Sequence, residues 1–421
     1  MRIVLRFLTA VVTVSVLLTS CNFRPLDHDR IDTWYEFAAF WLDVFFIYRD
    51  KLPSDLYAYS TPRELYDAVD EPFTAFLTPA QAKARRTDLS TERGGIGIRL
   101  DSAANGYVID KVYAGTPGDS AGLAAGDTIL RAGDLPLAGL TFEETFNALQ
   151  GEIGTEVVLR IKRGAGQFNV IIRRGVFMLP SVEADSLDSV TALIALGGFY
   201  NETVAAGGSA EEFSGALDST AWARYTLLDL RGNRGGYVTQ CIAIAGQLVP
   251  PETPIVRIRE REYVETTGSG VTVDTVYTTG GAGKARGRTF FVLVDGYTAS
   301  ASEMLVSCLM EQAHDRVTVI GTRTYGKGRG QVMIDGPDSV LAVVTCMTIT
   351  PVGDSAKTYD LVGIEPDVPV VDSTDAFDVA MEMIGEELPA KRRVAGRFKR
   401  PGRRDADPFA GEPSAVIERK P

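Results

Sequence analysis

The sequence predicts a protein of several domains that combines α/β and α+β architecture. Two apolar runs, residues 226–230 and 290–294, each lead through a turn into a segment of helical spacing, which is typical of buried strands followed by helices. Residues 89–174 instead form short alternating segments separated by glycine turns, which predicts a small β-rich unit. A chain of 421 residues with 45% hydrophobic content has room for more than one core.

The composition argues against nucleic acid as the main partner and against a metal site. The formal net charge of -12 and the pI of about 4.9 disfavour nucleic acid as the main partner. Cys241, Cys308 and Cys346 lie in apolar contexts and lack the spacing of metal ligands, which favours buried free thiols. We therefore expect neither a metal ion nor another cofactor.

Residues 1–20 have the pattern of a targeting signal. Arg2 and Arg6 precede the apolar run 7–18, which is too short for a comfortable membrane span and ends in Leu-Thr-Ser before Cys21. This resembles a bacterial lipoprotein signal, which implies cleavage before Cys21 and lipidation of that cysteine. An ordinary secretory signal with a chance cysteine is the alternative. We expect a lipid-anchored protein of the bacterial cell envelope that faces the periplasm.

Two further segments flank the body of the chain. Residues 21–88 are expected to form an anchor linker and a helical N-terminal region. Its aromatic residues repeat at helical spacing, and we interpret them as core rather than as a ligand site. They are Trp34, Phe37, Phe40, Trp41 and Phe45. Residues 388–421 are basic and contain prolines and glycines, which predicts a disordered, solvated tail. Contact of this tail with anionic lipid or glycan is the alternative.

A serine and a lysine lie in two segments suited to nucleophilic catalysis. Ser300 falls where the strand 290–294 turns into a helix, a corner at which a hydroxyl is exposed beside unpaired backbone N–H groups. The glycines on both sides of Lys327 allow its amine to approach that corner. A serine nucleophile with a neutral lysine base is a coherent mechanism, and with two histidines in the chain a histidine base is poorly supplied. Structural roles are the alternative, because Ser300 and Glu303 also form a capping box.

The two segments together resemble the family of carboxy-terminal processing proteases, also called tail-specific proteases. The resemblance rests on Thr-Ala-Ser-Ala-Ser-Glu at 298–303, Thr-Tyr-Gly-Lys-Gly at 324–328 and Gln331. It implies that Ser300 is the nucleophile, that Lys327 is its base and that Gln331 orients the lysine. The spacing from serine to lysine is two residues longer than is usual in the family, and we place the extra residues in the polar turn 311–315. Counting alone would select Ser302, whereas the geometry of the corner favours Ser300.

The turn 231–236, Arg-Gly-Asn-Arg-Gly-Gly, resembles another element of the same family. The resemblance implies that a backbone N–H of this turn, carried here by Gly235, joins that of Ala301 in an oxyanion hole. Arg234 stands where the family more often has proline or a small residue. An ordinary glycine turn between a strand and a helix is the alternative.

Residues 89–174 resemble a PDZ domain. A loop of Gly95, Ile96, Gly97 and Ile98 precedes Ala-Gly-Leu at 121–123 and Gly-Asp at 126–127, in the order found in that domain. A capping box at 141–144 marks the start of a helix. The resemblance implies that the loop binds the terminal carboxylate of a peptide that adds to the sheet as an extra strand.

These observations predict a serine endopeptidase with a Ser–Lys dyad. Its crotonase-like, tail-specific protease core would span residues 175–387, and the inserted PDZ domain would recruit envelope proteins or peptides by their free C-terminal tails. A catalytically inactive PDZ scaffold on a protease-like core is the first alternative. The second is another enzyme, or a small-ligand binder, on the same core.

Overall fold

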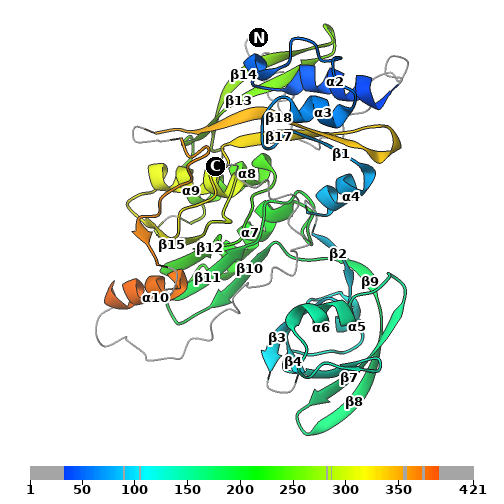
Figure 1. The fold of residues 1–421 in the computed structure, drawn as a ribbon. Coiled ribbons are helices and arrows are strands. Elements are labelled where there is room, and N and C mark those ends of the chain that lie inside the picture. The colour runs from blue at the N-terminus through cyan, green and yellow to red at the C-terminus, as the bar shows by residue number, and fades with distance from the viewer. Residues whose placement is uncertain are drawn as a thin grey trace, which may run out of the picture.

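The computed structural model describes residues 33–88, 91–103, 106–280, 283–285, 287–353, 358–371 and 375–387. Cys21 and the basic tail therefore lie outside the described residues. Figure 1 shows two stacked sheets with helices between and around them, and a small separate β-rich unit. Among the helices described, none combines the length and the apolar character needed to cross a membrane.

The central sheet carries the two apolar runs seen in the sequence. Its strands follow the order β10 (Val182–Ser186), β11 (Thr191–Leu196), β12 (Tyr225–Asp229), β15 (Thr289–Val294), β16 (Val317–Gly321) and β19 (Val368–Pro369). All neighbours are parallel except the β10–β11 pair. Parallel strands need crossover connections. Helices therefore cover both faces, as Figure 1 shows: α7 (Gly208–Ser219), α8 (Val238–Leu248) and α9 (Ala301–Gln312) lie on one face and α10 (Ala376–Glu387) on the other.

The residues of β15 explain why the sheet is covered on both faces. Phe290 and Val292 pack in the core that contains α8 and α9, while Phe291 and Leu293 pack in the core that contains α10. Strands buried on both faces are continuously apolar rather than alternating. The strand predicted at residues 290–294 is confirmed, and its C-terminal end leads directly to Ser300.

The second sheet holds the N-terminal region in place. Its strands follow the order β1 (Ala75–Leu77), β18 (Leu341–Pro351), β13 (Pro254–Val264) and β14 (Ser269–Thr278). Strand β17 (Arg329–Asp335) also pairs with β18, and the 3-10 turn η3 (Pro337–Ser339) lies between β17 and β18 in the chain. Helix α2 (Trp34–Phe45) packs on this sheet. It is followed by the 3-10 turn η2 (Arg49–Lys51), α3 (Pro62–Asp67) and α4 (Pro79–Asp88).

The N-terminal region is less purely helical than the sequence indicated. The aromatic stripe does form core, since Phe37, Trp41 and Phe45 are buried, although Trp34 is 39% exposed. Residues Ala75–Leu77, however, form strand β1, which pairs with residues 341–343 of β18. A three-residue strand is too short to show a recognisable period, and its partner strand β18 is far away in the sequence.

The β-rich unit has its own hydrophobic core. Strands β2 (Glu92–Gly95) and β9 (Gly175–Met178) pair where the chain enters and leaves this unit. Between them lie β3 (Ile98–Ala103), β4 (Gly106–Val112), β5 (Thr128–Ala132), β6 (Leu135–Pro136), β7 (Glu156–Arg163), β8 (Gly166–Arg173), α5 (Pro117–Ser120) and α6 (Phe142–Leu149). The capping box at the start of α6 is confirmed: Thr141 Oγ1 accepts from the Glu144 N–H at 3.2 Å, and the Glu144 carboxylate accepts from the Thr141 N–H at 2.7 Å.

Ion pairs join the β-rich unit to the central sheet. Glu183 on β10 pairs with Arg99 at 2.6 Å and with Lys111 at 3.1 Å, both from the β-rich unit. The hydroxyl of Tyr113 donates to the same carboxylate at 3.2 Å. Burial acts to raise the pKa of Glu183, but the two cations outweigh it and the pKa is lowered. Glu183 is therefore an ionised contact point between the two units.

Candidate active site

Ser300 lies at a strained corner between β15 and α9. It is the N-cap of α9, with φ 58° and ψ -117°, a conformation that L-residues rarely adopt. Its own N–H donates to Glu303 Oε2 at 2.9 Å. Ala301 is the first residue of the helix, so its N–H has no acceptor within the helix. Strand-to-helix turns strained in this way present the nucleophilic serines of α/β-hydrolases.

Ser302 occupies a different environment from Ser300. Its side chain is fully buried, and its hydroxyl donates to the backbone carbonyl of Asn233 at 3.0 Å. The hydroxyl of Ser302 thus binds the neighbouring turn inside the protein, while Ser300 occupies the N-cap position of the helix.

The turn between β12 and α8 touches this corner. A Cβ on Gly235 would lie 2.9 Å from both the Ser300 Cβ and the Ala301 nitrogen, and Gly235 has φ 98°, so no larger residue fits without strain. The N–H of Gly235 donates to the side-chain oxygen of Asn233 at 2.9 Å. A substrate oxygen at this corner would therefore compete with the Asn233 amide for that hydrogen.

Asn233 itself organises the turn, a role that the sequence did not reveal. Its side chain is fully buried and donates to the Leu196 carbonyl at 2.8 Å. Its backbone carbonyl accepts from the Ala299 N–H at 3.0 Å and from the Ser302 hydroxyl. Asn233 thereby connects the turn to the segment that carries Ser300.

A single carboxylate connects the serine corner to the lysine loop. Glu303 is fully buried, and its Oε1 accepts from the Thr324 hydroxyl and the Gly326 N–H, both at 2.6 Å. Its Oε2 accepts from the N–H groups of Lys327 at 2.8 Å and of Ser300 at 2.9 Å. Burial raises the pKa of Glu303, and these four hydrogen bonds act in the opposite direction. The sequence indicated only the capping half of this arrangement.

Lys327 is held where its charged form is disfavoured. Its Nζ lies 4.9 Å from the centroid of the Phe73 ring. Burial, followed by the positive charge of Arg85, lowers the pKa of Lys327 to about 8, while Glu71 and Glu303 act in the opposite direction. Phe73, Glu71 and Arg85 all belong to the N-terminal region, which the sequence assigned only to packing. A lysine with this pKa is substantially neutral near pH 8 and can accept a proton.

Gln331 lies in a hydrogen-bond network beside the lysine. Its Nε2 donates to Thr345 Oγ1 at 3.4 Å, and the Thr345 hydroxyl donates to Glu71 Oε2 at 2.6 Å. Arg329 pairs with the other oxygen of Glu71 at 3.1 Å. The structure therefore joins Gln331 to Glu71, one of the carboxylates that act on Lys327.

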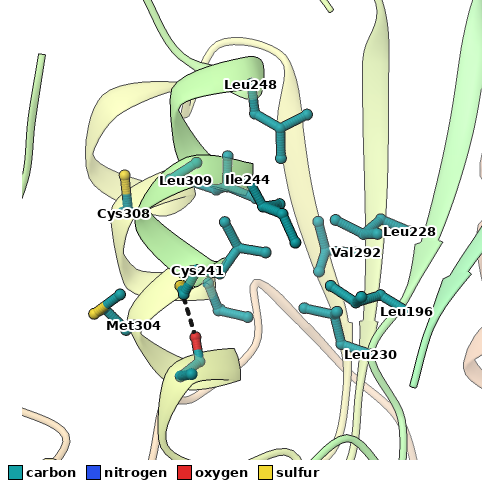
Figure 2. Close-up of a cluster of buried hydrophobic side chains, with 14 of the residues drawn as sticks. Leu196, Leu228, Leu230, Cys241, Ile244, Leu248, Val292, Met304, Cys308 and Leu309 are labelled. Carbon is teal, nitrogen blue, oxygen red and sulfur yellow. Dashed lines mark hydrogen bonds between the residues drawn. The ribbon is translucent and has the colours of Figure 1, made fainter. Parts of the chain in front are cut away.

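Buried residues pack against the helix that begins at the Ser300 corner. Figure 2 shows Cys241 of α8 pointing toward the first turn of α9, where its thiol donates to the Ala301 carbonyl at 3.0 Å. Cys241, Cys308 and Cys346 are all buried, and none forms a disulfide with another described cysteine, as the sequence predicted. In the described part of the chain, no group of three or more His, Cys, Asp or Glu side chains could hold a metal ion.

The glycines of the second candidate site shape its loop. Gly95 has φ 144° and Gly97 has φ 76°, and a Cβ on Gly97 would overlap the side chain of Thr116. The side chain of Ile96 is 5% exposed and belongs to the core of the β-rich unit, and Ile98 begins β3. The loop thus adopts a backbone path that a non-glycine residue could not follow at residue 97.

Two family models match parts of this chain, and known proteins resemble it over most of its length. Residues 191–370 match the family model described as Peptidase family S41, and residues 108–163 match that of the PDZ domain. The chain is similar to the carboxy-terminal processing protease CtpA of Bacillus subtilis (strain 168), with 27% identity over 70% of this chain and 62% of that protein. It is also similar to the carboxy-terminal-processing protease of Bartonella bacilliformis, with 26% identity over 83% of this chain and 76% of that protein.

A solved structure shares the fold. It is a protein of Bacteroides fragilis NCTC 9343 assigned to the S41 proteases, with a TM-score of 0.57, 16% sequence identity, and coverage of 87% of this chain and all of that one. The matched part of this chain spans about three fifths of the length of the Bacillus relative, 62%.

Proposed function

Because residues 191–370 match the model of peptidase family S41 and residues 108–163 match that of the PDZ domain, we propose that the protein is a serine endopeptidase that cleaves proteins recruited by their C-terminal tails. The observation that carries this proposal is the Glu303 carboxylate, which binds the N–H groups of both Ser300 and Lys327. One buried group thus holds a serine corner and a lysine loop in a fixed relation. Preorganisation of this kind is what a nucleophile and its base require.

In the proposed reaction, neutral Lys327 accepts the proton of the Ser300 hydroxyl as the Ser300 oxygen attacks the peptide carbonyl. The negative oxygen that forms is bound by the N–H of Ala301 and by that of Gly235, which exchanges its bond to Asn233 for one to the substrate. The lysine then gives its proton to the leaving amine, and an acyl-enzyme remains. Water, deprotonated by the same lysine, hydrolyses this ester and restores Ser300. Gln331 is proposed to orient Lys327 through the network that contains Thr345 and Glu71.

The PDZ domain is proposed to bind the free C-terminus of the substrate in the loop from Gly95 to Ile98. The strained glycines of this loop support that role, because they let backbone N–H groups approach a bound carboxylate. Lipidation at Cys21 is proposed to anchor the protein in the bacterial cell envelope, where the substrates would be envelope proteins. That part of the proposal is supported by the sequence pattern of residues 1–21 alone.

Covalent labelling with a serine-reactive phosphonate tests the proposed nucleophile. Ser300→Ala should abolish both labelling and peptide cleavage. Ser302→Ala should only weaken them, because Ser302 loses one hydrogen bond to Asn233, which is worth about 1 kcal/mol. Mass spectrometry should place the adduct on Ser300. An adduct on Ser302 would overturn the assignment, and a parent protein that neither labels nor cleaves would favour an inactive peptide-binding scaffold.

A further inference from the structure

We propose that Arg234 forms a carboxylate-binding subsite at the rim of the Ser300 corner, so that the peptidase prefers substrates with a carboxylate within about three residues of the cleaved bond. The inference rests on the proposed function and adds a substrate class to it. It concerns a position in the β12–α8 turn that no step of the proposed reaction uses.

The position of Arg234 places it beside the reacting atoms. It directly precedes Gly235, whose backbone touches the Ser300 corner. Its guanidinium carbon lies 5.5 Å from the ring centroid of Tyr297, a residue of the same corner. Adjacent Cα atoms are about 3.8 Å apart and an extended peptide advances about 3.3 Å per residue. A side chain at this position therefore meets substrate residues close to the bond that is cut.

Three other arginines near the site already have carboxylate partners. Arg231 pairs with Asp229 at 2.8 Å and with Asp375 at 2.7 Å. Arg323 pairs with Glu365. Arg329 pairs with Glu71 and with Asp360. Arg234 is exposed and makes no ion pair with any residue in the described ranges. Its charge is thus available to a ligand.

The corner itself supplies no carboxylate for Arg234. Asp295 is the acidic residue of the turn that leads to Ser300, and its side chain accepts from the N–H groups of Gly232, Tyr297 and Thr298. Tyr297 is 62% exposed, and its ring lies within cation–π distance of the guanidinium. A ring attracts the charge without accepting the N–H groups that match the two oxygens of a carboxylate.

The carboxylate has two sources, an Asp or Glu side chain near the cleaved bond or the C-terminus of a substrate cut close to its end. The first arm of the experiment uses end-blocked peptides with Glu or Gln at each of the three positions on either side of the bond. The second arm uses neutral peptides that end within three residues of the bond, as free acids or as amides. The measured quantity is the ratio of kcat/KM between the members of each pair, for the full-length protein.

We expect kcat/KM to be on the order of tenfold higher for the peptide with the carboxylate than for its neutral partner, in at least one position or arm. This is the effect that one hydrogen-bonded charge would give. Arg234→Gln should bring that ratio to about one, Arg234→Glu should invert it, and added salt should reduce it in the parent. Arg323→Gln is the matched control, since this exposed arginine already pairs with Glu365, and it should keep the parent ratio. Because Arg234 lies outside the PDZ domain, its variants separate this subsite from tail recognition.

Each possible result either supports or overturns the proposed subsite. Efficient cleavage with ratios of one throughout, or a ratio that persists in Arg234→Gln, overturns the subsite and leaves the peptidase assignment intact. Absence of both cleavage and phosphonate labelling in the parent overturns the peptidase assignment, and the subsite with it. Discrimination in the first arm assigns the ligand to an acidic side chain, and discrimination confined to the second assigns it to the substrate terminus.

Discussion

At the scale of single residues, the protonation of Lys327 sets the pH at which the proposed reaction can run. Burial and the charge of Arg85 hold its pKa at about 8, below that of a solvated lysine. The base must be neutral to accept a proton, so activity should increase as pH rises through about 8. The pH dependence of kcat/KM for a neutral peptide measures this midpoint.

Replacing Arg85 should move that midpoint. Arg85→Gln removes a positive charge that disfavours the protonated lysine, so the pKa of Lys327 should rise and the activity profile should shift to higher pH. Arg86→Gln is the control. Arg86 is the next residue on α4 and pairs with Asp335, and its replacement should leave the profile in place. An unchanged profile in Arg85→Gln would mean that Lys327 does not set the midpoint.

At the scale of elements, helix α2 fixes the N-terminal region from which Glu71, Phe73 and Arg85 reach the lysine. Trp41 is 4% exposed in the core between α2 and the second sheet. Trp41→Ala should therefore lower the free energy of unfolding by about 3–5 kcal/mol, through lost burial and a cavity. Denaturant unfolding measures this change.

Trp222→Ala provides the comparison for α2. Trp222 is 47% exposed, so its removal should change the free energy of unfolding by no more than about 0.5 kcal/mol. Equal effects of the two substitutions would show that α2 does not stabilise the body of the protein in solution.

At the scale of the whole molecule, tail recognition should require a free carboxylate. The full-length Ser300→Ala variant should bind peptides without cutting them. Peptides with an apolar free C-terminus should bind to it at least about tenfold more tightly than their amides. The reason is that amidation removes the charge that the loop N–H groups would hold. Calorimetric titration measures both affinities. Gly97→Ala should remove the difference, since its Cβ would overlap Thr116. Equal affinities in the Ser300→Ala protein would contradict a carboxylate site.

The proposed anchor also acts on the whole molecule. Cys21→Ser should release the protein from membranes into the aqueous phase, because the lipid would have no attachment site, while turnover of a soluble peptide should be retained. Partitioning between detergent and aqueous phases measures this. A Cys21→Ser variant that remains in the detergent phase would exclude Cys21 as the anchor.

Features with a local pattern could be predicted from the amino-acid sequence alone. Apolar runs ending in turns gave the strands at 226–230 and 290–294 and the corner at Ser300, and a Thr-to-Glu spacing gave the start of α6. Glycine positions likewise marked the loop at residues 95–98. Strand period, cap chemistry and backbone freedom at glycine are properties of a few consecutive residues, so they can be read without knowing the partners.

The tertiary structure decided which groups meet at the lysine and the serine. Glu303 spans from the Ser300 corner to the lysine loop, and Phe73 comes to Lys327 from the N-terminal region. Neither contact has a local signature. A buried carboxylate or amine keeps its position because packing excludes water and leaves it these partners alone, and packing between distant segments is fixed only when the whole chain has folded.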